Sequence, residues 1–589
     1  MRFLAILLMT APLYAQTGLF PLAEVRPGMQ ATGRTVFSGS RIEEFQAEIL
    51  GVLENAGPRQ SLILARLSGG PLASTGVLQG MSGSPVYIDG RLVGAVAMTF
   101  AYSKEPIAAL RPIEDMLSAG AREPERRVRA RASLADTDLT LALEPASSVL
   151  AGGMRLVDVA TPVSFGGFTR NSLEQFGPRL RALGLEPQQG IAGGGRLKPG
   201  LGDPKTLEPG SMISVQLLTG DMSVSADGTV TYIDGTRVYA FGHRLLALGS
   251  TDIPFARSDV ITLVPNLSSS FKISVPREWM GTIRADHSTG VSGEVGRKAA
   301  MIPFTIAVTS HSGTQAEARR QVYTMEMVND GVLSPLLVQM ALASTIEATE
   351  RAVGNSTLAV RGEIRFEENA TPIRLNNTYA GEAGLPQMAS LAAATPLAYA
   401  LQSGFDGLRR LRGIDIEVDS YPERRQAQID QVWTSGREVH PGGTVELHVV
   451  LTGPSGAEMS RKVSYRVPIG AATGPLYFTV ADGSTANMAE YRQLLVSPPR
   501  SPSQLVAFLN SLRSNTSAHV RVWRAQPDFD VQGERFPSPP PSVEQILARS
   551  QAGVGATMLS RDAKVGEIEI ESGGMVVSGS KTVQVEIKE

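Results

Sequence analysis

The sequence contains no cysteine, so disulfide bonds, thiolate metal sites and a cysteine nucleophile are all excluded. Charge of one sign is not in excess either, because 55 Lys and Arg stand against 57 Asp and Glu, for a formal net charge of −2. This balance argues against nucleic-acid binding through bulk positive charge. Hydrophobic residues make up 42% and charged residues 19%, which is typical of a chain that folds around a core.

Long hydrophobic runs are also lacking, since no stretch reaches the ~18 uninterrupted apolar residues of a membrane-spanning helix. The N-terminus instead has Arg2, a short apolar run over residues 3–9 and a small residue, Ala15. This pattern predicts a secretory signal peptide over residues 1–15. We therefore expect a secreted or periplasmic protein that begins near Gln16 and keeps no stable transmembrane anchor.

Glycine and proline are abundant, at 60 and 37 residues, and favour short strands and turns over long helices. The pair Asp89-Gly90 lies between two β-prone runs and predicts a tight hairpin. A helix is predicted over residues 334–353, with Ser334 as its cap and Pro335 at the first helical position. The composition therefore predicts a mainly β fold with a few helices.

The sharpest local signal is the hexapeptide GMSGSP at residues 80–85. Its glycines permit a tight turn that exposes the Ser82 hydroxyl, and the turn directs the amides of Gly80 and Ser82 to one point where an oxyanion could form. Chymotrypsin-like proteases carry Gly-Asp-Ser-Gly-Gly-Pro at this place, which makes Ser82 the candidate nucleophile. The alternative is a Gly/Ser-rich turn without chemistry.

A serine hydroxyl needs a base to act as a nucleophile, and the first of the six histidines is His243. His243 follows a β run and Gly242, which suits a side chain that faces a cleft, and His287 is the second candidate. The alternative for each is an ordinary surface or core histidine. The residues after His243 include no second histidine or carboxylate at a tight ligand spacing, so we expect no metal and no cofactor.

Two stretches resemble the SpoIVB peptidases, serine proteases of bacterial sporulation signalling and their relatives. Residues 33–117, with GMSGSPVYIDGRLVGAV and the closing PIEDML, resemble the serine half, and residues 209–296 resemble the other half. The pair Gly242-His243 falls on the catalytic histidine of that family. The resemblance implies a serine endopeptidase that acts on proteins or peptides. It further implies a chymotrypsin-like double β-barrel built from two separated segments, with Ser82 as nucleophile and His243 as general base.

The sequence departs from that family in two ways. The serine half precedes the histidine half, which is tolerable because docking of two barrels, and not chain order, forms the cleft. Residues 66–75 contain no Asp or Glu where the sporulation enzyme has an acid, so the third member stays open. Asp252 and Asp286 are candidates, beside a Ser-His dyad or a triad closed by a backbone carbonyl or a polar side chain.

A second hypothesis is a catalytically inactive, protease-like scaffold that binds envelope partners, for which the C-terminal modules are the expected contact. The Arg-rich stretch at residues 121–133 mixes in acids and lacks aromatics, so we interpret it as a solvated connector and not a nucleic-acid site. The predicted segments are a signal peptide (1–15), a serine-bearing barrel half (16–120), a connector with a small insertion (121–208), a histidine-bearing barrel half (209–310), a mixed α/β module (311–435), a β-sandwich-like module (436–500) and a C-terminal α/β module (501–589).

Overall fold

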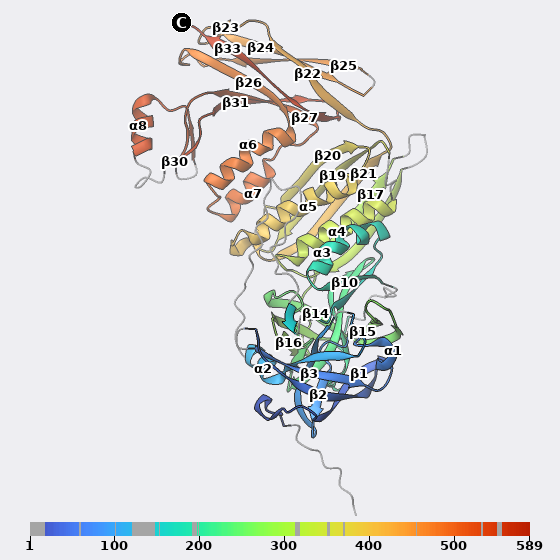
Figure 1. The fold of residues 1–589 in the computed structure, drawn as a ribbon. Coiled ribbons are helices and arrows are strands. Elements are labelled where there is room, and N and C mark those ends of the chain that lie inside the picture. Colours follow the sequence, from blue (N-terminus) through green and yellow to red (C-terminus); the bar gives the residue numbers. More distant parts are fainter. Residues whose placement is uncertain are drawn as a thin grey trace, which may run out of the picture.

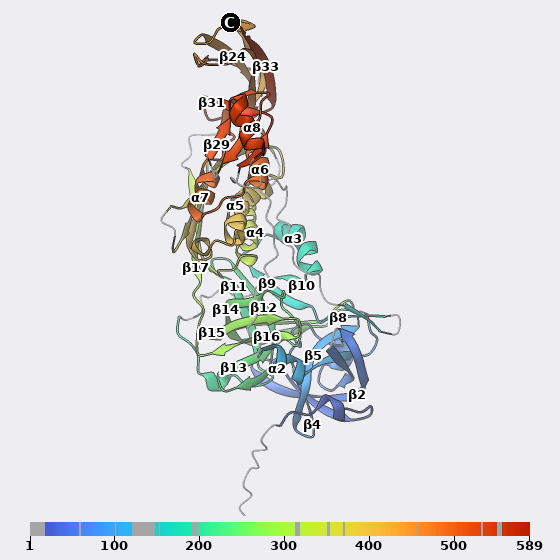
Figure 2. The same cartoon turned by 90° about the vertical axis from the view of Figure 1, so that its left-hand side faces the viewer.

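The computed structural model extends along one axis, with β-rich parts at both ends and a layer of helices between them (Figures 1 and 2). Strands dominate, which confirms the expectation of a mainly β fold. The predicted signal peptide and the Arg-rich connector lie outside the described residues. The structure describes residues 18–589 without 58–59, 101, 121–147, 152–153, 191–196, 198, 312–317, 350–353, 369–370, 455, 532–533 and 550–555.

Six antiparallel strands near the N-terminus pair in an order that returns to its first strand. The elements of this part are η1 (Leu22–Glu24), β1 (Gln30–Ser38), β2 (Arg41–Gly57), β3 (Gln60–Ser68), α1 (Leu72–Thr75), β4 (Pro85–Ile88), β5 (Arg91–Phe100), β6 (Ile107–Pro112), α2 (Ile113–Gly120), β7 (Ser148–Ala151) and β8 (Met154–Asp158). The order is β4, β1, β2, β3, β6, β5 and back to β4, and we call it the serine ring. Buried side chains such as Phe45, Ile63 and Leu110 fill its interior.

A second set of six strands also pairs in a closed order. The elements of this part of the chain are β9 (Thr161–Gly166), α3 (Arg170–Ala182), β10 (Leu185–Gln189), η2 (Pro204–Thr206), β11 (Met212–Gly220), β12 (Ser223–Asp234), β13 (Arg237–Ala240), β14 (Gly249–Val264), β15 (Phe271–His287) and β16 (Gly290–Val295). The order is β12, β13, β16, β15, β14, β11 and back to β12, and we call it the histidine ring. Strands β9 and β10 extend it from β12 to a free edge.

The middle part continues the same sheet, because β11 also pairs with β18. Its elements are β17 (Ile302–Ser310), β18 (Arg319–Met327), α4 (Leu333–Thr349), β19 (Ser356–Phe366), β20 (Ile373–Gly381), α5 (Leu385–Gln402), η3 (Asp406–Leu408) and β21 (Leu411–Tyr421). Helices α4 and α5 lie side by side against this sheet (Figure 1). One large hydrophobic cluster runs from the histidine ring into this layer, so the two parts share a core.

Helix α4 is present as expected, but the prediction that Ser334 caps it is wrong. The carboxylate of Asp330 accepts hydrogen bonds from the backbone N–H groups of Val332 and Leu333, at 2.8 and 2.9 Å. The Ser334 hydroxyl instead donates to the Val328 carbonyl at 2.7 Å. The helix therefore begins at Leu333, two residues before the predicted first helical position, because an upstream carboxylate satisfies its first amides.

The C-terminal part contains two packed sheets and a small third sheet. Its elements are β22 (Gln426–Thr434), β23 (Glu438–Val439), β24 (Thr444–Thr452), β25 (Glu458–Arg466), β26 (Gly474–Asp482), α6 (Gly483–Val496), α7 (Pro502–Asn510), β27 (Ser517–Arg524), β28 (Asp528–Val531), β29 (Glu534–Pro537), α8 (Pro541–Arg549), β30 (Ala556–Ser560), β31 (Ala563–Glu571), β32 (Val576–Ser578) and β33 (Ser580–Ile587). Strands β32 and β33, near the end of the chain, pair with β22 and β26. Residues far apart in sequence thus build one core.

We expect Gly33→Ala to destabilise the serine ring. Gly33 pairs with Phe45 across β1 and β2, and a Cβ atom at position 33 would lie 2.0 Å from the Phe45 ring. Overpacking of this kind costs about 1–3 kcal/mol, so the lowest unfolding transition in calorimetry should move to a lower temperature. Gly200→Ala is the control, since a Cβ there has no heavy atom within 4 Å. Equal midpoints for the two variants would contradict the prediction.

Candidate active site

Ser82 lies in the turn before β4, and this turn docks directly on β12 of the histidine ring. The backbone N–H of Thr229 donates to the Ser82 carbonyl at 2.9 Å, and the Thr229 hydroxyl donates to the Gly80 carbonyl at 2.9 Å. The Thr231 hydroxyl donates to the Gly83 carbonyl at 2.7 Å. All of these residues are buried. Three hydrogen bonds therefore join the two rings at the serine turn.

Only glycine fits at position 83 of this turn. Gly83 has a φ of +91°, and a Cβ there would lie 2.1 Å from the Thr229 carbonyl oxygen and 2.5 Å from the Phe241 nitrogen. The chain after β13 turns sharply as well, because Phe241 and Gly242 have φ values of +70° and +67°. A positive φ is uncommon for a bulky residue and strains the backbone, so the surrounding packing must hold this turn in place.

The two turns meet at one carbonyl group in β5. The backbone N–H of Gly83 donates to the Val96 carbonyl at 2.8 Å, and a Cβ at Gly242 would lie 2.9 Å from the same oxygen. Ser82 and His243 are the chain neighbours of these two glycines. The structure therefore brings the two predicted residues onto adjacent turns, although 161 positions separate them in the sequence (243 − 82).

Both side chains are enclosed, with Ser82 0% and His243 2% exposed. The His243 ring nitrogen Nδ1 lies 2.7 Å from the Arg244 carbonyl oxygen. A carbonyl only accepts hydrogen bonds, so Nδ1 carries the proton and Nε2 is left as an acceptor. Neither His243 Nε2 nor Ser82 Oγ has a hydrogen-bond partner among the described residues. His243 Nε2 is thus an acceptor, but it is not hydrogen-bonded to Ser82 Oγ.

The backbone of the serine turn leaves two amides available. The N–H groups of Met81, Gly83 and Ser84 donate to the carbonyls of Leu78, Val96 and Met81. Within the described part of the chain, the N–H groups of Gly80 and Ser82 donate to no backbone or side-chain acceptor. These are the two amides that the sequence predicted for an oxyanion hole.

Asp286, one candidate for the third member, holds the loop that follows His243. Its carboxylate accepts hydrogen bonds from the backbone N–H groups of Leu245, Leu246 and Leu248, at 2.8, 2.7 and 3.1 Å. Burial raises the pKa of Asp286, and these three hydrogen bonds partly oppose that rise. The carboxylate therefore acts on the position of His243 through the loop backbone.

Asp252, the other candidate, lies at the surface, where it pairs with Arg284 at 2.6 Å. His287, the second candidate base, is half-buried at the end of β15, and burial lowers its pKa. Within the described contacts, the Nδ1 partner of His243 is the Arg244 carbonyl and no carboxylate.

A buried lysine lies beneath the serine turn and was not predicted from the sequence. Lys272 on β15 is 1% exposed and its ammonium donates to the Thr35 hydroxyl at 2.8 Å. The Ser84 hydroxyl donates to the same Thr35 oxygen at 3.0 Å. A Cβ at Gly80 would lie 3.4 Å from Lys272 Cδ, so the lysine stem supports the backbone of the turn.

Asp227 on β12 is the acidic counterpart of this lysine. Burial lowers the pKa of Lys272 to about 7, and the charge of Asp227 partly opposes that shift. Burial also raises the pKa of Asp227 to about 6, although its carboxylate accepts a hydrogen bond from Ser274 at 2.6 Å. The sequence pattern of β15 could have indicated this polar network, because Lys272 and Ser274 are polar residues at inward positions of an alternating strand.

A cavity of about 550 Å³ adjoins the serine turn. Gln79, which directly precedes Gly80, lines it, and its amide nitrogen donates to Ser269 at 2.9 Å. The side-chain amide oxygen of Gln79, Oε1, has no partner among the described residues. Residues of the edge strand β10 form the opposite wall. Polar groups thus line an open space next to the predicted oxyanion hole.

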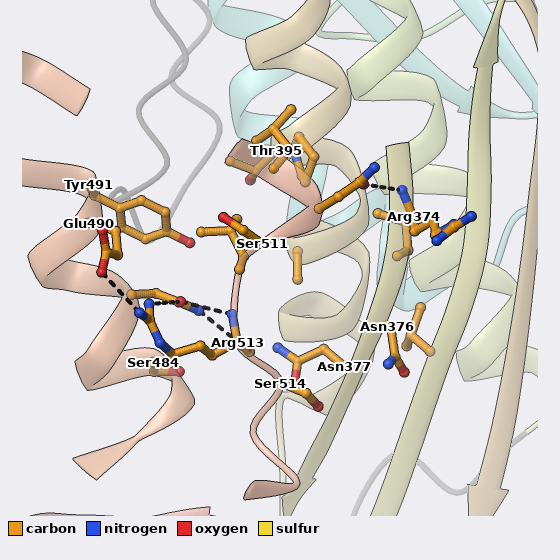
Figure 3. Close-up of a pocket in the computed structure, with 18 of the residues that line it drawn as sticks. Arg374, Asn376, Asn377, Thr395, Ser484, Glu490, Tyr491, Ser511, Arg513 and Ser514 are labelled. Atoms are coloured by element: carbon orange, nitrogen blue, oxygen red, sulfur yellow. Dashed lines mark hydrogen bonds and ion pairs between the residues drawn. The ribbon is translucent and has the colours of Figure 1, made fainter. Parts of the chain in front are cut away.

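A larger cavity of about 1150 Å³ lies between the middle and C-terminal parts (Figure 3). Arg374 and Asn377 reach it from β20, and Glu490 and Arg513 pair at 2.9 Å on its other side. None of the predicted site residues lines it. Among the described residues, no group of three or more His, Asp or Glu side chains is arranged to hold a metal ion.

Comparison with known proteins supports a peptidase assignment for the N-terminal part. Residues 17–109 match the family model of SpoIVB peptidase S55. The match confirms the SpoIVB-type resemblance over this stretch and indicates a serine peptidase at the level of the family. It contains Ser82 and ends before His243.

Other comparisons add little. No curated protein matches the chain. A superantigen-like protein from Staphylococcus aureus is 11% identical over 35% of this chain and 92% of its own, with a TM-score of 0.11, too low to support any argument. No helix within the described ranges is long and apolar enough to cross a membrane.

We expect Lys272→Met to remove a pH dependence of stability. Between about pH 7 and its usual pKa of 10.5, Lys272 is neutral when folded and protonated when unfolded. The wild-type free energy of unfolding, relative to that of the variant, should therefore rise with pH in this window by up to about 1.4 kcal/mol per pH unit. Urea unfolding at pH 7, 8 and 9 measures it. The exposed Lys205→Met is the control, and parallel pH profiles for wild type and Lys272→Met would refute the expectation.

Proposed function

We propose that this chain is a secreted or periplasmic serine endopeptidase of the SpoIVB type, in which the serine ring and the histidine ring are the two barrels of a chymotrypsin-like fold. The observation that carries the proposal is the meeting of the Ser82 and His243 turns at the Val96 carbonyl. The family match over residues 17–109 supports the same class of enzyme. Its substrates are proteins or peptides.

In the proposed mechanism, His243 Nε2 accepts the proton of the Ser82 hydroxyl as its oxygen attacks a peptide carbonyl. The amides of Gly80 and Ser82 stabilise the negative charge that develops on the carbonyl oxygen. The imidazolium then gives its proton to the leaving amine, which breaks the peptide bond and leaves an acyl-enzyme. Water, activated by the same histidine, hydrolyses this ester and restores the Ser82 hydroxyl.

The Arg244 carbonyl takes the place of the usual acid in this proposal. It accepts the Nδ1 proton of His243, so it holds the ring and its tautomer without adding a full negative charge. A carbonyl dipole stabilises the imidazolium less than a carboxylate does. We therefore describe the catalytic group as a Ser82–His243 dyad, with Asp286 positioning the loop.

A second candidate function is an inactive protease-like scaffold that binds envelope partners through its C-terminal modules. The observation that favours it is the complete burial of Ser82, because no substrate reaches the hydroxyl in this conformation. The two functions differ in whether Ser82 reacts, and this difference can be measured.

Fluorophosphonate labelling of the folded wild-type protein should place the adduct on Ser82, as located by peptide mass spectrometry. Ser82→Ala should lose the adduct completely, and His243→Gln should react at least about a thousandfold more slowly, because both members of the dyad are needed to activate the nucleophile. Ser103→Ala, at an exposed serine, is the control and should label like the wild type. An adduct on another serine would contradict the proposed nucleophile.

A further inference from the structure

Strand β5 carries two different neighbours along one edge beside the site. Ala95 pairs with Pro85 of β4, and Val96 then exchanges two hydrogen bonds with the serine turn, to Ser84 and Gly83. The next residue, Ala97, accepts a hydrogen bond from the Val159 N–H at 2.9 Å. The pairing of β5 with β6 is irregular between Val96 and Met98, which lets consecutive residues face the same edge. Val159 therefore follows the serine turn directly along β5.

The segment before Val159 continues this pairing away from the site. Asp158, Val157 and Leu156 pair antiparallel with Met98, Thr99 and Phe100, so β8 adds a strand to β5 (Figure 2). An extended peptide commonly binds a protein by adding a strand to an open edge, where main-chain hydrogen bonds hold it and pockets select its side chains. Residues 156–159 make those main-chain bonds beside the candidate nucleophile.

The Val159 side chain is buried in the hydrophobic cluster of the serine ring. It is 1% exposed and belongs to the same hydrophobic cluster as Leu78, Met81 and Val96. Leu78 and Met81 flank the predicted oxyanion amide of Gly80 in sequence. The apolar core that takes up this branched aliphatic side chain thus includes side chains of the segment that carries the candidate nucleophile.

We propose that residues 156–159 are an internal ligand of the substrate groove, and that this groove takes extended peptides with a small aliphatic residue at the place of Val159. The inference rests on the proposed peptidase function. It accounts for the burial of Ser82 and His243, since the edge strand that a substrate needs is already paired. A substrate enters only after this segment leaves β5.

The test is the rate of fluorophosphonate labelling of Ser82 in Val159→Asp. A carboxylate in this apolar core is unfavourable, so the segment should leave the groove and labelling should be at least about tenfold faster than in the wild type. Val322→Asp, at a half-exposed valine of β18, introduces the same side chain far from the site and should label at the wild-type rate. Circular dichroism and the unfolding midpoint establish that each variant is folded.

A second measurement does not depend on labelling. A synthetic peptide with the sequence of residues 154–162 should bind Ser82→Ala/Val159→Asp at least about tenfold more tightly than Ser82→Ala alone in calorimetric titration, because the internal competitor is gone. Equal affinities, or equal labelling rates in folded Val159→Asp and wild type, would overturn the inference and leave the proposed function intact. Absence of a Ser82 adduct in every folded variant, Val159→Asp included, would overturn both.

Discussion

The candidate site depends on the docking of one turn onto a strand of the other ring. Thr229 binds the carbonyls of Ser82 and Gly80, and Thr231 binds that of Gly83. Each of these carbonyls is buried and would cost about 1–3 kcal/mol if left without a partner. The side chain and backbone of β12 therefore set the conformation of the serine turn, and neither ring alone can form the site.

Polar groups beneath the turn extend this dependence. Lys272 and Asp227 are fully enclosed. Burial lowers the pKa of Lys272 and raises that of Asp227, and both shifts favour the neutral form of the side chain. Lys272 donates to the Thr35 hydroxyl, which also accepts from Ser84, and Ser274 donates to one carboxylate oxygen of Asp227. A core that holds such groups is stable only when their partners are in place. The network therefore stabilises the one relative position of the two rings in which these hydrogen bonds form.

The proposed chemistry and the closed state of the site follow from the same arrangement. His243 Nε2 is an acceptor because the other ring nitrogen donates to the Arg244 carbonyl, and within the described ranges the amides of Gly80 and Ser82 donate to no acceptor. The site is nevertheless covered, and the pairing of residues 156–159 with β5 offers a physical reason. Ser82 Oγ and His243 Nε2 are not hydrogen-bonded to each other in this closed state. An enzyme with an occupied groove would therefore be controlled both by access to Ser82 and by closure of the Ser82–His243 hydrogen bond.

The sequence predicted a mainly β fold, the serine turn and the N-terminal family resemblance, because glycine spacing, turn pairs and alternation are local signals. It also proposed the pairing of Ser82 with His243, from the need of a serine for a base and the place of His243 after a β run and Gly242, and from the family resemblance. The sequence did not predict the Asp330 cap, the Lys272–Asp227 network or the pairing of β8 with β5. Each of these depends on contacts between residues that local periodicity does not relate. The sequence by itself therefore determined which segments become strands and which turn carries the candidate nucleophile, but the exposed hydroxyl that it predicted is wrong, because Ser82 is buried. Only the tertiary structure decided what faces that turn, because hydrogen bonds and burial between distant segments exist only once the rings are docked.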